Sequence, residues 1–235
     1  MTDESSPLIA VTADVHLSEA HPERLACLRR LLDELRARRI RTLIVAGDLF
    51  DAKIKGYKQF DALAGEYPDI SFHIIPGNHD ANLDKRVLAA GHVAVHRETT
   101  VLAFDDLQVV FVPYRADSSV GRQLLAAGIR GRTLSLLVSH GDVTGEDRAR
   151  RAYEQVYFPV SAADLARHGI RAGILGHIHE AREECSGALA YTGTLCPVAS
   201  NEQGPHRYLT VDTRTAAIAS CPFWPDTFHD GLEIL

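Results

Sequence analysis

The chain has 235 residues, of which 46% are hydrophobic and 24% are charged, and its formal net charge is -6. This composition is that of a globular protein and excludes fibrous and disordered chains, and the length suits a single domain over residues 1–235. The negative charge argues against a broad basic surface for nucleic acid, although bound divalent cations would locally reverse the sign of an acidic site.

Five short apolar runs dominate the sequence and are typical of buried strands. They lie at 8–11, 42–46, 71–75, 133–138 and 172–175. Three segments with helical periodicity lie between them, at 23–39, 57–66 and 119–127. The alternation of strands and helices predicts an α/β fold.

The second half of the chain adds strands without helical patterns between them. These strand candidates lie at 107–112, 188–193, 207–212 and 216–221. We therefore expect a mixed or partly antiparallel sheet there. The longest connection, residues 141–159, is polar and charged, and we expect it to line the rim of a site.

Side chains of metal-binding type follow each of the five apolar runs. Open α/β sheets bind ligands outside the carboxyl ends of their strands, so five such ends can converge on one crevice. Residues two apart on an extended segment point to the same side, which pairs Asp14 with His16 and His177 with His179. The full set of predicted metal ligands is Asp14, His16, Asp48, Asn78, His140, His177 and His179.

Seven ligands exceed what one ion needs, whereas two ions sharing a bridging carboxylate would use all of them. Asp48 is the natural bridge. Carboxylate, imidazole and amide groups without thiolate suit two divalent ions, with manganese first and iron or zinc as alternatives. Two ions about 3.5 to 4 Å apart can activate water and hold the oxygens of an in-line phosphoryl displacement, so the sequence predicts hydrolysis of a phosphate ester.

His79 stands beside Asn78 and is surplus to the ligand count. We expect it to act as the general acid for the leaving oxygen, or to stabilise charge in the transition state. A carboxylate should orient its imidazole, and Asp51 and Asp80 are both candidates.

In these blocks the chain resembles the calcineurin-like metallophosphoesterases. The blocks are DVH (14–16), GDLFD (47–51), GNHD (77–80), SHGD (139–142) and GHIH (176–179). The resemblance implies a two-sheet mixed β-sandwich flanked by helices. It also gives His79 the family's catalytic histidine position, and it favours Asp51 over Asp80 as the partner of that histidine.

The same resemblance divides the ligands into two sets that share Asp48. Set 1 is Asp14, His16, Asp48 and His179. Set 2 is Asp48, Asn78, His140 and His177.

Within this superfamily the chain resembles the SbcD branch, the nuclease subunits of DNA double-strand-break repair, through VPYR (112–115) and YTGTL (191–195). The resemblance implies a DNA endonuclease or exonuclease. SbcD-type chains usually continue into a DNA-capping domain and a helical segment that binds an SbcC-like ATPase. This chain ends at Leu235, soon after the sandwich should close, so we expect a minimal enzyme without that ATPase-binding segment.

Two alternatives remain open. The first is a phosphatase or a phosphodiesterase acting on nucleotides or other small molecules. The SHGD block also resembles UDP-diacylglucosamine pyrophosphohydrolases, but these carry Arg where this chain has His79, which argues against a lipid substrate. The second is a non-catalytic scaffold, although scaffolds typically lose ligands and none is missing here.

The sequence contains no apolar run of the roughly 18 to 20 residues needed to span a membrane, and its start lacks the pattern of a signal peptide. We expect a cytoplasmic protein without a membrane partner.

Overall fold

Two six-stranded sheets form the centre of the computed structural model, which describes residues 6–52, 56–131, 134–145, 156–199, 202 and 206–224. The first sheet has the order β12-β11-β1-β2-β3-β4. Its strands are β1 (Leu8–Thr12), β2 (Thr42–Ala46), β3 (Ser71–Ile75), β4 (Val93–Val95), β11 (His206–Asp212) and β12 (Ile218–Phe223). Strands β1 to β4 are parallel, whereas β11 runs antiparallel to β1 and to β12.

The second sheet has the order β5-β6-β7-β8-β10-β9. Its strands are β5 (Thr100–Phe104), β6 (Leu107–Val112), β7 (Ser135–His140), β8 (Ala172–Gly176), β9 (Arg182–Glu184) and β10 (Leu189–Tyr191). Strands β6, β7, β8 and β10 are parallel, and the two edge strands are antiparallel to their neighbours.

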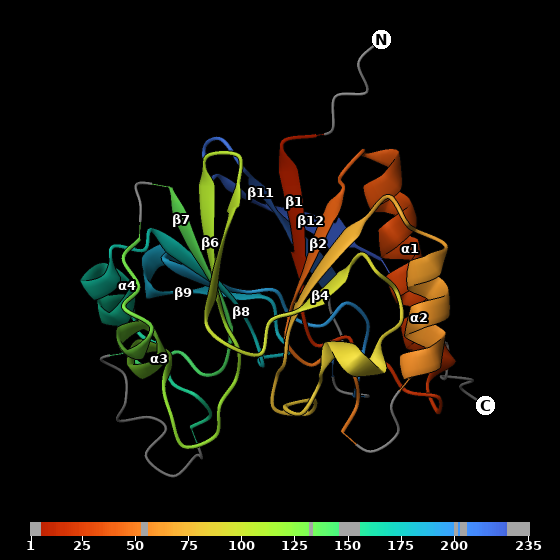
Figure 1. Ribbon diagram of the computed structural model, residues 1–235, viewed down its shortest axis with the longest axis horizontal. Helices are drawn as coiled ribbons and strands as arrows, with labels where there is room; N and C mark the ends of the chain where they lie inside the picture. The colour runs from red at the N-terminus through yellow and green to blue at the C-terminus, as the bar shows by residue number, and fades with distance from the viewer. Residues whose placement is uncertain are drawn as a thin grey trace, which may run out of the picture.

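The two sheets face each other, and helices cover their outer faces (Figure 1). Helices α1 (Pro22–Ala37) and α2 (Tyr57–Gly65) lie against the first sheet, and α3 (Val120–Ala126) and α4 (Ala162–His168) lie against the second. Two short 3-10 turns, η1 (Lys85–Val87) and η3 (Cys185–Gly187), complete the regular structure of the described residues. No helix in the described part of the chain is both long and apolar enough to cross a membrane.

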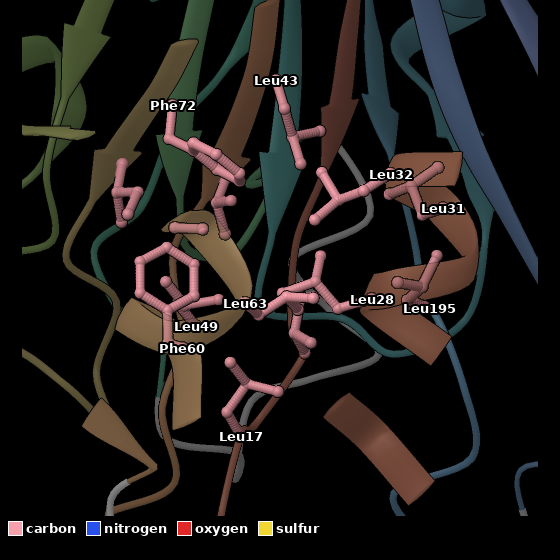
Figure 2. Packing of buried hydrophobic residues seen from close by; sticks show 14 of the residues in the cluster. Leu17, Leu28, Leu31, Leu32, Leu43, Leu49, Phe60, Leu63, Phe72 and Leu195 are labelled. Atoms are coloured by element: carbon pink, nitrogen blue, oxygen red, sulfur yellow. The ribbon is translucent and has the colours of Figure 1, made fainter. Parts of the chain in front are cut away.

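The alternation of side chains along each strand produces three apolar layers, because successive residues of a strand point to opposite faces. In β6, Val109 and Phe111 face the layer between the sheets, while Val110 and Val112 pack under α3 and α4. The third layer joins α1 and α2 to the first sheet, where Leu28 of α1 and Phe60 of α2 lie among buried leucines (Figure 2). Each sheet is therefore covered on both faces, which explains why central strands such as β2, β6 and β7 are nearly continuous apolar runs.

The structure confirms the predicted α/β sandwich of two mixed sheets flanked by helices. The five apolar runs form β1, β2, β3, β7 and β8. Of the later strands, β11 and β12 run antiparallel while β6 and β10 run parallel to their neighbours, so both sheets are mixed as expected. Three short strands, β4, β5 and β9, and helix α4 were not predicted. Within the predicted connection 141–159, residues 146–155 lie outside the described residues.

Candidate metal centre

All seven predicted ligands lie at the carboxyl ends of five parallel strands, three from the first sheet and two from the second. Backbone hydrogen bonds join the loops that carry them. The amide of Asp14 donates to the carbonyl of Gly47 at 3.1 Å, and the amide of His16 donates to the carbonyl of Asp48 at 3.0 Å. In the second sheet, the amide of Gly141 donates to the carbonyl of Gly176 at 3.3 Å. The strand ends of both sheets thus present their polar side chains to one place.

Two groups of ligand atoms form around Asp48. In one group, Nε2 of His16 and Nε2 of His179 are 3.2 Å apart. In the other, Nε2 of His140 and Nδ1 of His177 each lie 2.9 Å from Oδ1 of Asn78. Oδ2 of Asp48 is 3.3 Å from Nε2 of His140 and 3.9 Å from Nε2 of His16. This carboxylate lies between the two groups, as a bridging ligand would.

The donor set fits divalent ions. Ligand atoms bound to one ion at about 2.0 to 2.2 Å can be at most about 4.4 Å apart. One ligand atom from each of Asp14, His16 and His179 already lies within 4.8 Å of the others, and the same holds for Asp14, Asp48 and His140. The first triad belongs to set 1, and small adjustments would close it around an ion. The second triad joins ligands of both sets through Asp48. Nδ1 of His140 donates to the carbonyl of Ala46 at 2.9 Å, which leaves Nε2 free to bind an ion.

Four of the ligands have left-handed backbone conformations. The φ angles are 52° at Asp14, 50° at His16, 52° at Asp48 and 97° at His177. Such conformations are uncommon outside glycine, cost on the order of 1 to 3 kcal/mol each, and cluster at functional sites. This strain is consistent with a site selected for the positions of its ligands.

Two glycines let the ligands approach one another. A Cβ atom on Gly47, whose φ is +92°, would lie 2.1 Å from Nδ1 of His140. A Cβ atom on Gly77 would lie 2.2 Å from Oδ1 of Asp48 and 2.6 Å from its backbone nitrogen. Real Cβ atoms do not approach other atoms so closely, so both positions require glycine.

The buried ionisable groups of the site perturb one another's pKa values. Burial raises the pKa of Asp14 to about 7 and lowers the pKa values of His16 and His177 to about 4 each. Burial alone would also lower the pKa of His140, but the neighbouring Asp48 carboxylate raises it to about 9. The same contact holds the pKa of Asp48 well below its usual range, although burial opposes this. Buried, mutually perturbed groups of this kind are typical of functional sites.

His79 lies beside the two ligand groups with an exposed side chain. Its backbone amide donates to Oδ1 of Asp48 at 2.8 Å, and its ring meets the ring of His16 edge-on, with centroids 4.8 Å apart. The imidazole can therefore reach both the centre and a substrate arriving from solvent, as the predicted catalytic role requires.

The two carboxylates predicted to orient His79 have other contacts in the structure. Buried Asp80 accepts hydrogen bonds from the amides of Gly77 at 2.7 Å and Phe50 at 3.2 Å, and burial raises its pKa to about 6. A carboxylate oxygen of Asp51 lies 3.7 Å from Nη1 of Arg24. The orientation of His79 by Asp51 or Asp80 stays a prediction.

Sequence reasoning missed three residues that support the ligands. Oε1 of Glu202 is 2.5 Å from Nδ1 of His179, and Oδ1 of Asp142 is 3.8 Å from Nε2 of His177. Buried Arg24 donates from Nη1 to the carbonyl of His16 at 2.9 Å. Only Asp142 carried a signal, because it belongs to the SHGD block. Arg24 and Glu202 stand outside every motif.

Comparison with known proteins agrees with this geometry. Residues 7–181 match the sequence profile of the calcineurin-like phosphoesterases. The chain belongs to this family. It is therefore a metal-dependent hydrolase, and its family membership carries the expectation of two divalent metal ions.

This calcineurin-like phosphoesterase is 26% identical over 218 residues to a UDP-2,3-diacylglucosamine hydrolase of Ralstonia nicotianae, with 76% of this chain and 79% of the relative covered. Among solved structures, a dimetal phosphatase from Danio rerio matches with a TM-score of 0.58 at 13% identity, over 89% of this chain and 93% of that one. The structure of an archaeal phosphodiesterase matches over 92% of this chain and 99% of that one, at 13% identity and with a TM-score of 0.47. The Danio rerio structure supports the fold alone, and these relatives do not confirm the SbcD branch.

Proposed function

We propose that this calcineurin-like phosphoesterase cleaves phosphodiester bonds whose leaving group is an alcohol, and that its substrate is a nucleic acid, with DNA first. The exposed imidazole of His79 next to Asp48, at the edge of the ligand cluster, supports the alcohol leaving group. The resemblance of VPYR (112–115) and YTGTL (191–195) to the SbcD branch supports DNA as the substrate. Two divalent ions held by sets 1 and 2 would polarise the phosphoryl oxygens and make water nucleophilic at neutral pH.

The leaving group explains why His79 matters. When a phosphodiester of a sugar hydroxyl is cleaved, the departing oxygen is strongly basic and needs a proton as its bond to phosphorus breaks. An imidazole is a good donor near neutral pH, and such general acids contribute about 10²- to 10⁴-fold to the rate. When a pyrophosphate is cleaved, the departing phosphate ester is a weak base and needs no proton. A histidine at position 79 therefore favours diesters over pyrophosphates.

The test compares two leaving groups in the presence of Mn²⁺. The parent chain should cleave a thymidine dinucleotide, labelled single-stranded DNA and bis(p-nitrophenyl) phosphate. His79→Ala should lower kcat on the dinucleotide by about 10²- to 10⁴-fold and lower it much less on bis(p-nitrophenyl) phosphate, whose phenolate leaves without a proton. His21→Ala, which alters an exposed histidine outside both ligand sets, should leave both rates unchanged.

Equal losses on the two substrates would remove the general-acid role from His79. Failure of the parent chain to cleave DNA or the dinucleotide would overturn the nuclease proposal.

A second candidate is hydrolysis of a lipid-linked sugar nucleotide, which the relative from Ralstonia nicotianae favours. His79 opposes it, because the resembling pyrophosphohydrolases carry Arg at that position. Assaying UDP-2,3-diacylglucosamine beside the dinucleotide separates the two candidates. Turnover of the lipid without cleavage of DNA would assign the lipid substrate, and turnover of p-nitrophenyl phosphate alone would assign a phosphatase.

A further inference from the structure

A carboxylate outside every motif contacts one of the predicted ligands. Glu202 lies in the segment after β10, and its Oε1 is 2.5 Å from Nδ1 of His179. Its side chain is 17% exposed, so water competes little for this contact. The contact therefore belongs to the interior of the candidate metal centre and is not a surface ion pair.

The second oxygen of Glu202 is fixed as well. Oε2 accepts hydrogen bonds from the amide of Val198 at 2.8 Å and from the hydroxyl of Thr194 at 3.4 Å. The amide of Thr194 in turn donates to the carbonyl of His179 at 3.0 Å. Both oxygens thus have defined partners, and the carboxylate cannot turn away from the imidazole without breaking a hydrogen bond.

Arg24 ties the same segment to a second ligand. Its Nη1 donates to the carbonyl of His16 at 2.9 Å, and its Nη2 donates to the carbonyl of Val198 at 3.4 Å. Glu202 and Arg24 therefore connect one loop to His179 and His16, which are the two histidines of set 1.

The carboxylate of Glu202 fixes the tautomer of His179. An ionised carboxylate only accepts hydrogen bonds, so the proton of a neutral His179 ring lies on Nδ1. The lone pair then lies on Nε2, which is 3.2 Å from Nε2 of His16 and faces the first group of ligand atoms. A hydrogen bond to a carboxylate also makes an imidazole a stronger donor to a metal ion.

We propose that Glu202 is a positioning residue of the metal centre, which orients His179 and raises the affinity of set 1 for its ion. This inference rests on the two-ion centre of the proposed function but not on its substrate. It predicts that Glu202 affects one of the two ions, because the ligand that Glu202 contacts is His179, which belongs to set 1 alone.

Calorimetric titration of the metal-free chain with Mn²⁺ tests the inference directly. The parent chain should bind two ions. Glu202→Gln, which keeps the size of the side chain and removes its charge, should weaken one of the two sites by about 10- to 100-fold and leave the other unchanged. Glu202→Asp, which keeps the charge, should recover part of the lost affinity.

Glu180→Gln is the matched control, because this glutamate is adjacent to His179 in sequence while its side chain is 78% exposed. It should bind both ions like the parent chain. Urea unfolding of each variant in EDTA shows whether a variant is folded before metal is added, and the visible spectrum of the Co²⁺-loaded forms reports the ligand field of the weakened site.

Three outcomes would decide against the inference. If Glu202→Gln bound both ions with the affinity of the parent chain, the inference about Glu202 would be wrong and the two-ion centre would remain. An equal loss of affinity at both sites would have the same consequence, because it indicates a general structural role. Absence of Mn²⁺ binding by the folded parent chain would overturn the two-ion centre and this inference together. A failure to cleave DNA, with metal binding intact, would leave this inference standing and remove only the substrate proposal.

Discussion

At the scale of single residues, Gly77 sets how closely the loop after β3 approaches Asp48. A Cβ atom at this position would lie 2.2 Å from Oδ1 and 2.6 Å from the backbone nitrogen of Asp48. Backbone cannot give way as a flexible side chain can, so Gly77→Ala should displace the carboxylate that both ligand sets share. We expect weaker binding of both ions, by about 10-fold or more, and a loss of about 1 to 3 kcal/mol of unfolding free energy in EDTA. Calorimetry with Mn²⁺ and urea unfolding measure the two effects.

Gly65→Ala is the control for this substitution. Gly65 is the last residue of α2, and nothing lies within 4 Å of a Cβ atom built there. Alanine is the better helix former, so this variant should bind metal normally and be equally or slightly more stable. Normal metal binding by Gly77→Ala would contradict the crowding seen around Asp48.

The sequence shows that the seven predicted ligands lie together, because each follows an apolar run and the strand determines where the next residues lie. The partners of those ligands could not be predicted from the sequence. Glu202 reaches His179 only because β10 pairs with β8, which brings a distant part of the chain beside His179. Such contacts depend on the packing of distant segments, and no local pattern encodes them.

At the scale of elements, α4 illustrates what a periodicity argument misses. Leu165 and His168 are its buried side chains, so it has almost no apolar stripe. Its ends are nevertheless encoded locally. Ser161 and Asp164 form a capping box at the start, and Gly169 ends the helix with a φ of 68°. The strands β4 and β9 have three residues each, too few for alternation to be recognised.

Removal of the cap tests this explanation. The hydroxyl of Ser161 accepts a hydrogen bond from the amide of Asp164 at 3.2 Å. Ser161→Ala leaves that amide without its partner and should lower the unfolding free energy by about 1 kcal/mol in urea titrations. Ser71→Ala, at the exposed start of β3, should change stability by less than about 0.5 kcal/mol. Equal stability of Ser161→Ala and the parent would mean that packing of Leu165 alone holds α4.

At the scale of the whole molecule, a pair of histidines joins the two sheets. His73 of β3 and His96, just after β4, stack with ring centroids 5.3 Å apart, and Nδ1 of His73 lies 3.0 Å from Nε2 of His96. Both rings also contact Phe111 of the second sheet, with centroids 5.9 Å and 4.4 Å away. The pair thus closes one edge of the layer between the sheets with groups that can become charged.

Burial lowers the pKa of His73, and burial together with the neighbouring His73 lowers the pKa of His96 from 6.5 to about 4. Between pH 4 and pH 6.5 the unfolded chain binds a proton at His96 more readily than the folded chain does. The stability contributed by the neutral ring is therefore complete above pH 6.5 and is lost as the pH falls towards 4. Since the ring is partly exposed, the loss should be on the order of 1 to 2 kcal/mol.

Replacing one ring isolates this contribution from that of the many carboxylates. His96→Phe keeps the contact with Phe111 and cannot be protonated, so the parent chain should lose on the order of 1 to 2 kcal/mol more than this variant between pH 6.5 and 4. Urea unfolding in EDTA at several pH values measures the difference without a contribution from bound metal. His21→Gln, at an exposed position, should follow the parent curve. If the His96→Phe and parent curves ran parallel, the closure of the sandwich would not depend on the charge of this pair. Acid sensitivity between pH 6.5 and 4 would then have to come from other histidines whose pKa values burial lowers, such as His16 and His177.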